Sequence, residues 1–302
     1  MNSMHPCRSC PGTLLLASLA FILIAVCSKA GDAPELKPNA VIALEFPELP
    51  PTYFTQKTHK NEPARLSAQL PEDYAADRRF PLFVFLDGGN GGVGSDASFA
   101  RRIVGPRGFI AVNLPLFKEP KATAPTIPGL NRSLGDLVHP GDAAVLAKSY
   151  RVMLEKLAQA VPNIATEGST LGGFSNGAHA TSVLAAARDE FILRHFTSFV
   201  FLEGGIGLAL NPTALSDPAM KGHRFLVLFG DHDKNPETQA QRERFSAPIN
   251  ALIEQQAKAA QLDFTSIIMT GYGHEEPPEY LKLIGAWTRG EKLPEIPNDN
   301  RK

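Results

Sequence analysis

Short runs of apolar residues alternate along this chain with longer segments in which apolar residues recur at helical spacing. The run Pro81–Leu86 (PLFVFL) is apolar throughout and is followed by glycines, which is typical of a strand buried on both faces. Further strands are expected at Val41–Phe46, Ala64–Leu70, Phe109–Asn113, Ser169–Phe174, Ser198–Leu202, Phe225–Phe229 and Phe264–Met269. Helices are expected at Ala143–Ala160, Asn176–Arg188, Pro236–Ala260 and Pro278–Thr288. This alternation predicts an α/β fold with a mostly parallel central sheet of about eight strands, covered by helices on both faces.

Composition and charge narrow the class of protein. Of 302 residues, 43% are hydrophobic and 20% are charged, which is ordinary globular usage. The 30 basic and 31 acidic residues leave a net charge of −1, and no basic block stands out, so we do not expect nucleic acid as a partner. Without an internal repeat or a linker, residues 31–302 are expected to form a single domain.

The N-terminal segment is typical of a secretory signal peptide. An apolar run, Leu14–Val26, follows Arg8 and precedes the small residues Ser28 and Ala30. The run is shorter than the roughly 20 residues that a membrane-spanning helix needs. We therefore expect cleavage after Ala30 and export to the periplasm or the extracellular space. An uncleaved anchor helix and a lipid anchor at Cys27 remain as alternatives.

All three cysteines, Cys7, Cys10 and Cys27, lie within that segment. A chain cut after Ala30 has no thiol, and therefore no disulfide, no cysteine nucleophile and no cysteine-based zinc site.

The motif with the most chemical content is Gly173-Phe174-Ser175-Asn176-Gly177, a G-x-S-x-G sequence between an expected strand and an expected helix. This is the context in which such a motif forms a sharp turn that exposes the serine hydroxyl. We therefore expect Ser175 to be a nucleophile.

A serine nucleophile needs a base, and the base needs an acid that fixes its tautomer. His274 follows the last expected strand, and Asp233 follows the strand before it. The predicted catalytic residues are therefore Ser175, Asp233 and His274. Asp231, on the same loop, and Glu203, at the end of the preceding strand, are alternatives for the acid. A metal site at Asp231–Asp233 is not expected, because three consecutive residues cannot all point at one ion.

Glycines follow the strand Pro81–Leu86 and suit an oxyanion hole, because the backbone can approach a substrate closely there. We assign its N–H groups to Gly89 and Asn176, with Gly88 as the alternative to Gly89. The spacing Gly89, Gly91, Gly94 also matches a dinucleotide-binding pattern. The next strand, however, ends in Asn113 rather than in the acidic residue that would bind a ribose, so no nucleotide cofactor is expected. His179, one turn into the helix after Ser175, is expected to be a packing or surface residue.

With these motifs in place, Ala64–Trp287 resembles an α/β-hydrolase. The turn Leu86–Gly89 is similar to that of secreted esterases of the feruloyl, enterochelin and esterase D types. The segment Gly273–Glu275, followed by two prolines, resembles small bacterial carboxylesterases and dienelactone-hydrolase-like proteins. The chain departs from these esterases at Ala178, where they usually have a second glycine after the motif, and no histidine precedes the oxyanion glycines.

The resemblance implies a cofactor-independent serine esterase that forms an acyl-serine intermediate. The segment Gly204–His223 is too short for a large lid, which favours small or polymer-attached esters as substrates. Two alternatives stay open: a serine peptidase of the prolyl-oligopeptidase type, and a non-catalytic binding protein on the same scaffold.

Overall fold

The computed structural model describes residues 35–49, 62–89, 94–116, 143–165, 167–211, 213–241, 243 and 247–295. Contacts divide the chain into two units, Met1–Ala33 and Pro34–Lys302, and every described residue belongs to the second. The predicted signal peptide and the three cysteines lie outside the described residues. None of the helices within the described ranges has both the length and the apolar character needed to cross a membrane.

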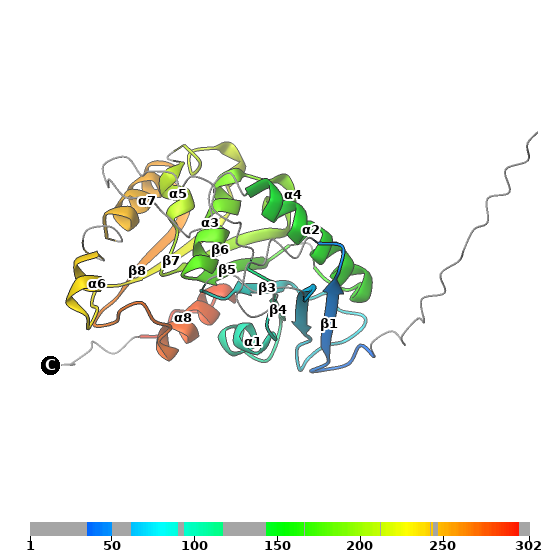
Figure 1. Ribbon diagram of the computed structural model, residues 1–302. Coiled ribbons are helices and arrows are strands. Elements are labelled where there is room, and N and C mark those ends of the chain that lie inside the picture. Colours follow the sequence, from blue (N-terminus) through cyan, green and yellow to red (C-terminus); the bar gives the residue numbers. More distant parts are fainter. Residues whose placement is uncertain are drawn as a thin grey trace, which may run out of the picture. The chain divides into compact units, whose positions relative to one another are not determined.

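The predicted mostly parallel sheet is confirmed (Figure 1). In the described part of the chain it has eight strands, in the order β1-β2-β4-β3-β5-β6-β7-β8. Strand β2 is antiparallel to both of its neighbours, and all other pairs are parallel. The strands are β1 (Val41–Phe46), β2 (Ala64–Gln69), β3 (Leu82–Leu86), β4 (Ile110–Asn113), β5 (Ser169–Phe174), β6 (Phe196–Leu202), β7 (Arg224–Gly230) and β8 (Asp263–Met269).

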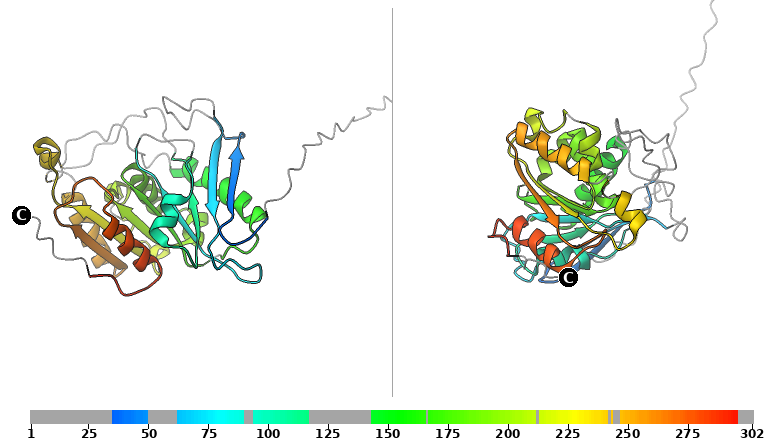
Figure 2. Two further views of the ribbon diagram at one scale, coloured as in Figure 1. Left: turned by 90° about the horizontal axis from the view of Figure 1, so that it is seen from below. Right: turned by 90° about the vertical axis from the view of Figure 1, so that its left-hand side faces the viewer.

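Helices cover both faces of the sheet (Figures 1 and 2). Helices α1 (Ser98–Val104) and α8 (Pro278–Thr288) pack on one face. The other face is covered by α2 (Ala143–Ala160), α3 (Asn176–Ala187), α4 (Glu190–His195), α5 (Ile206–Leu210) and α7 (Ala247–Ala259). Helix α6 (Pro236–Gln241) follows β7.

The burial of strand β3 on both faces explains why its sequence is apolar throughout. All five of its residues are buried. Phe83 and Phe85 face the core beneath α1 and α8, whereas Leu82, Val84 and Leu86 face the core beneath α2 and α3. Since side chains alternate along a strand, a strand covered on both faces needs an apolar residue at every position.

The expected single helix Pro236–Ala260 is two helices, α6 and α7. The physical reason lies at Pro248, the second residue of α7. Proline has no N–H and is tolerated in the first turn of a helix but not in its interior. A helix therefore starts next to Pro248 rather than running through it.

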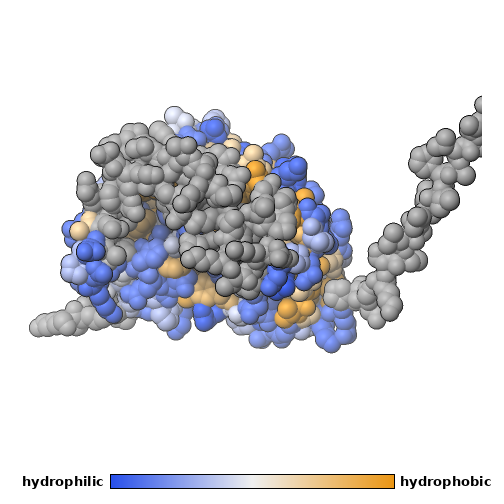
Figure 3. Space-filling model, viewed as in Figure 1, coloured by the Kyte–Doolittle hydropathy of each residue, from blue (hydrophilic) through white to orange (hydrophobic). Residues whose placement is uncertain are grey.

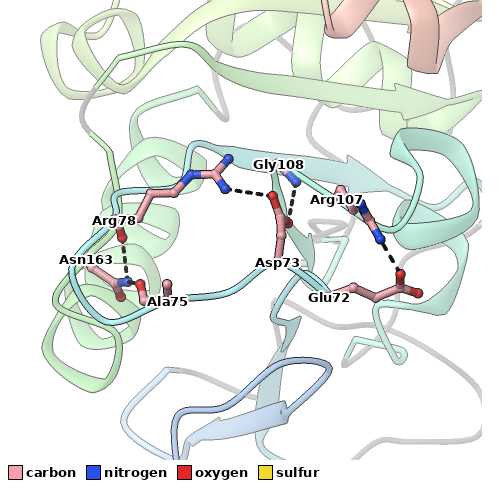
Figure 4. Close-up of polar contacts among 7 residues, drawn as sticks. All are labelled: Glu72, Asp73, Ala75, Arg78, Arg107, Gly108 and Asn163. Atoms are coloured by element: carbon pink, nitrogen blue, oxygen red, sulfur yellow. Dashed lines mark hydrogen bonds and ion pairs between the residues drawn. The ribbon is translucent and has the colours of Figure 1, made fainter.

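A network of polar contacts lies at the amino ends of the parallel strands, whereas the serine motif follows the carboxyl end of β5 (Figure 4). The Asp73 carboxylate accepts hydrogen bonds from Arg78 Nη1, at 2.8 Å, and from the Gly108 N–H, at 2.9 Å. Asn163, which precedes β5, donates from Nδ2 to the carbonyls of Ala75 and Arg78. These bonds connect the β2–β3 loop to the starts of β4 and β5 and so fix the parallel strands from their amino ends.

Among the described residues, the exposed large apolar side chains lie on three different elements. They are Val41 on β1, Leu252 on α7 and Ile268 on β8. In Figure 3, the apolar patches among the coloured residues are small and separated by hydrophilic ones. Surface apolar residues that are scattered in this way need no partner.

Candidate active site

Ser175 lies between β5 and α3, at the turn that the motif predicts (Figure 1). Its backbone has φ 54° and ψ −118°, a conformation that costs a non-glycine residue of the order of 1–3 kcal/mol. The turn brings α3 so close to β3 that a Cβ atom on Gly177 would lie 2.3 Å from the carbonyl oxygen of Leu86. The second glycine of the motif is therefore required by this contact, and the turn raises the Ser175 side chain above the end of β5.

His274 reaches Ser175 from the loop between β8 and α8. Its Nε2 atom lies 2.8 Å from Ser175 Oγ, which is hydrogen-bonding distance. To get there, the loop crosses the end of β7, where a Cβ atom on Gly230 would lie 2.2 Å from the carbonyl oxygen of Tyr272. Only a glycine at 230 leaves room for this crossing.

Two further hydrogen bonds hold the same loop against the residues that follow β7. The Gly271 N–H donates to Asp231 Oδ1 at 2.7 Å, and the His232 N–H donates to the Tyr272 carbonyl at 2.9 Å. Asp231, an alternative for the acid, thus contacts the loop backbone on the approach to His274.

Glu203 takes the place at His274 that the sequence suggests for Asp233. Its Oε2 lies 3.3 Å from His274 Nδ1, and its Oε1 accepts a hydrogen bond from the Gly230 N–H. The Glu203 side chain is 2% exposed, whereas that of His274 is 48% exposed. A buried carboxylate on Nδ1 favours the tautomer in which Nε2 can accept the serine proton.

Asp233 makes other contacts. Its Oδ1 accepts the Asn235 N–H at 3.2 Å, and its own N–H donates to Gln239 Oε1. The carboxylate that the structure places at His274 Nδ1 is that of Glu203, the alternative named from the sequence, and Glu203 is therefore the candidate for the acid. The physical reason is the strand order: β6 lies directly beside β5, and the Ser175 N–H donates to the carbonyl of Leu202 at the end of β6. Glu203 is the next residue, one strand closer to the serine than Asp233.

The residues expected to form an oxyanion hole also lie beside Ser175. A Cβ atom on Gly88 would be 3.1 Å from the Cβ of Ser175, and Asn176 Nδ2 donates to the carbonyl of Gly89. The main-chain N–H of Asn176 is at the start of α3, where N–H groups have no acceptor within the helix. The structure thus brings Gly88, Gly89 and Asn176 around the serine; residues 90–93 of the same glycine-rich segment lie outside the described ranges.

No protein-family model and no curated protein sequence matches the chain. Among solved structures, a protein assigned as a dipeptidyl aminopeptidase IV from Bacteroides ovatus aligns with a TM-score of 0.50 at 13% identity. The alignment covers 84% of this chain but 36% of that protein. The poly(3-hydroxybutyrate) depolymerase LpqC from Bordetella parapertussis aligns at 0.49 with 17% identity, covering 86% and 92% of the two chains. A ferulic acid esterase from Anaeromyces mucronatus aligns at 0.49 with 12% identity, covering 84% and 93%.

The first of these alignments and the strand order agree with the sequence-based expectation. The chain has the α/β-hydrolase fold. At these identities the likeness establishes the fold alone, and the activity has to be argued from the site.

In the same loop, Glu276 follows His274 by two residues and is half-buried. Burial, together with the charge of Asp87, raises the pKa of the Glu276 carboxyl to about 7, against the opposing effects of Arg102 and His274. Asp87 is itself held by hydrogen bonds from Ser95 Oγ, at 2.7 Å, and from Asn113 Nδ2, at 3.1 Å. Near neutral pH, the charge beside His274 therefore depends on the protonation of Glu276.

His179, expected to be a packing or surface residue, lies against the segment that follows Glu203. Its Nδ1 accepts the N–H groups of Gly205 and Ile206, both at 3.3 Å. Burial, together with the charge of His274, lowers the pKa of His179 to about 3. The sequence could have indicated this position. Residues four apart on a helix lie on the same face, so His179 is expected one turn from Ser175 on the face that carries the site.

In the described ranges, no group of three or more histidine, cysteine, aspartate or glutamate side chains is arranged to hold a metal ion. A hydroxyl, an imidazole, a carboxylate and backbone N–H groups thus lie together at Ser175, and such a set can support acyl transfer.

Proposed function

We propose that this protein hydrolyses carboxylic esters through an acyl-serine intermediate on Ser175. The observation that carries the proposal is the continuous chain from Ser175 Oγ through the His274 ring to the buried Glu203 carboxylate, at 2.8 Å and 3.3 Å. Nucleophile, base and acid come from three different strand ends, so this arrangement is produced by the fold and not by a local sequence pattern.

In the first half-reaction, Ser175 Oγ attacks the ester carbonyl carbon and transfers its proton to His274 Nε2. The carbonyl π electrons move to oxygen, and backbone N–H groups of Asn176 and of Gly88 or Gly89 stabilise the oxyanion. When the tetrahedral intermediate collapses, the C–O bond to the alcohol breaks and His274 returns the proton to the departing oxygen. Glu203 stabilises the imidazolium ion between these two proton transfers.

In the second half-reaction, water takes the place of the alcohol. His274 accepts a proton from the water as its oxygen attacks the acyl carbon, and then protonates Ser175 Oγ as the acyl–serine bond breaks. The products are a carboxylic acid and the free enzyme, and the cycle consumes no co-reactant other than water.

The choice of ester over amide rests on leaving-group chemistry, since an alcohol departs more readily than an amine. Peptide hydrolysis by the same residues is the alternative that must be tested. Purified protein should be assayed on a p-nitrophenyl ester and on the anilide of the same acid, with Ser175→Ala as the control. We expect ester turnover that falls by several orders of magnitude in Ser175→Ala. Faster turnover of the anilide would favour a peptidase, and equal activity in Ser175→Ala would overturn the proposal.

We also propose that the protein acts outside the cytoplasm, because residues 1–30 have the features of a signal peptide. The mass of the protein recovered from cells tests this. A chain that begins at Gly31 supports cleavage after Ala30, a diacylglycerol-modified N-terminus at Cys27 indicates a lipid anchor, and an intact Met1 terminus contradicts both.

A further inference from the structure

The His179 ring lies at the junction of the two segments that carry Ser175 and Glu203. The main-chain N–H of His179 donates to the carbonyl of Ser175 at 3.0 Å, which places the residue one helical turn from the nucleophile. A Cβ atom on Gly204, the residue after Glu203, would lie 2.8 Å from the Ser175 carbonyl oxygen and 3.1 Å from the His179 nitrogen. The two segments are therefore in direct contact beside the ring.

Two backbone N–H groups determine which nitrogen of the His179 ring carries the proton. Nδ1 accepts from the N–H groups of both Gly205 and Ile206, and a nitrogen that accepts hydrogen bonds cannot carry a proton. The proton of the neutral ring is therefore on Nε2. Because burial and the charge of His274 keep the pKa of His179 near 3, the ring stays neutral under ordinary conditions.

The Nε2–H group has no hydrogen-bond partner among the described residues. The residue as a whole is partly exposed. His179 thus holds a neutral Nε2–H donor, one helical turn from Ser175, that the described residues leave without an acceptor. The mechanism above leaves this donor unused.

We propose that the Nε2–H of His179 binds an acceptor oxygen of the substrate next to the scissile ester, and that the site therefore prefers esters with an ether, hydroxyl or carbonyl oxygen there. This inference rests on the proposed ester hydrolysis. An alkyl chain would displace water from Nε2–H without replacing its hydrogen bond, whereas an acceptor oxygen restores it. The same physical effect allows polar sites to reject analogues that lack a hydrogen-bonding group.

Two pairs of esters that differ only by oxygen in place of a methylene test the preference. On the acyl side, p-nitrophenyl methoxyacetate is compared with p-nitrophenyl butanoate. On the alcohol side, 2-methoxyethyl acetate is compared with butyl acetate. Each ratio of kcat/KM is divided by the ratio of the alkaline hydrolysis rates of the same two esters, which removes the difference in intrinsic reactivity.

The decisive variant is His179→Asn, because the Asn oxygen can occupy the place of Nδ1 and accept from Gly205 and Ile206 while the Nε2 donor is lost. His179→Gln places an amide nitrogen near the position of Nε2 and should restore part of the preference. His195→Asn is the matched control, since His195 precedes β6 and lies at the opposite end of that strand from Glu203.

We expect the wild-type protein to prefer the oxygen-containing ester in at least one pair, and His179→Asn to reduce that ratio by about 2- to 10-fold. His195→Asn should keep the wild-type ratio. A merely structural role of His179 would lower turnover of both esters together and leave the ratio unchanged, and that result overturns the inference.

The controls separate this inference from the proposed function. Wild-type turnover of all four esters without any preference overturns the role of His179 and leaves the esterase proposal intact. A wild-type protein that hydrolyses none of the four overturns both. Should His179→Asn fail to fold, the wild-type ratio measured from pH 5 to pH 9 decides. A preference that stays constant over this range supports the neutral donor, and a ratio that changes within it contradicts the inference.

Discussion

Replacing Glu203 by Gln should nearly abolish turnover, whereas replacing Asp233 by Asn should not. Glu203 Oε2 lies 3.3 Å from His274 Nδ1. At an effective dielectric constant of about 20, two unit charges at this separation attract by about 5 kcal/mol. The His274 side chain is 48% exposed, so solvent reduces this value to about 3–4 kcal/mol. Each 1.36 kcal/mol is a factor of ten in rate, which gives an expected loss of about 10²- to 10³-fold in kcat.

A second effect acts in the same direction. Gln can turn its amide nitrogen towards Nδ1 and donate to it, which leaves the proton of the neutral ring on Nε2. His274 could then not accept the proton of Ser175. The shape of the residue and an acceptor for the Gly230 N–H are both preserved, so the loss reflects charge and tautomer rather than packing.

The assay is kcat on a single activated ester for wild type, Glu203→Gln and Asp233→Asn, with circular dichroism to show that each variant is folded. Asp233→Asn keeps an acceptor for the Asn235 N–H and should remain within about threefold of wild type. The assignment of Glu203 is refuted if Asp233→Asn loses activity as severely as predicted for Glu203→Gln, while Glu203→Gln keeps it.

Three further predictions concern residues around the catalytic chain. Gly230→Ala places a Cβ atom 2.2 Å from the Tyr272 carbonyl oxygen and should displace the loop that carries His274. We expect kcat to fall by at least tenfold, because the base is then misplaced. A folded Gly230→Ala variant with the kcat of wild type would contradict this. Because the pKa of His179 is lowered from 6.5 to about 3, the unfolded chain binds a proton that the folded one does not, and stability falls as pH drops below 6.5. His179→Asn removes this effect. In urea unfolding between pH 7 and pH 5, the variant should therefore lose less unfolding free energy than wild type, by up to about 2 kcal/mol. Equal losses in the two proteins would contradict the prediction. The pKa of Glu276, in contrast, is raised from 4.5 to about 7, so the stability of the wild-type fold is lost as pH rises through that range. Between pH 5 and pH 8, the unfolding free energy of Glu276→Gln should therefore rise by about 1–2 kcal/mol relative to that of wild type, a value reduced for the partial exposure of Glu276. An unchanged difference would show that Glu276 is ionised at pH 5.

Strong periodicity made much of the fold predictable from the sequence. Helix α2 begins and ends at the predicted residues because it carries a long periodic apolar pattern, and strand β5 does so because Gly168 precedes it and the serine motif ends it. Helices α1, α4 and α5, of five to seven residues, were not predicted, since so few residues hardly form a periodic pattern.

The site shows a different limit of sequence reasoning. Ser175 and His274 each follow a strand that the sequence predicts, and the structure places the two side chains in contact. The acid is ambiguous in the sequence, because Glu203 and Asp233 both lie between them in chain order. Only the three-dimensional structure favours Glu203, because β6 lies beside β5 and the buried Glu203 side chain contacts His274.

His179 illustrates the same limit for a single side chain. Its position on the helix can be read from the sequence, but its tautomer depends on the N–H groups of Gly205 and Ile206, which come from a different strand end. Hydrogen-bond partners that are distant in sequence determine whether a buried histidine is a donor, an acceptor or a proton carrier.

The most direct test of an assembled catalytic serine is covalent labelling with a fluorophosphonate, followed by intact-mass measurement and peptide mapping. The reagent reacts with a serine whose proton a neighbouring base removes, so it reports the contact between Ser175 and His274 without any assumption about the substrate. We predict one adduct per chain, on Ser175, that is absent after prior denaturation and absent in Ser175→Ala and His274→Ala. A folded wild-type protein that remains unlabelled, or that is labelled on another residue, would contradict the account.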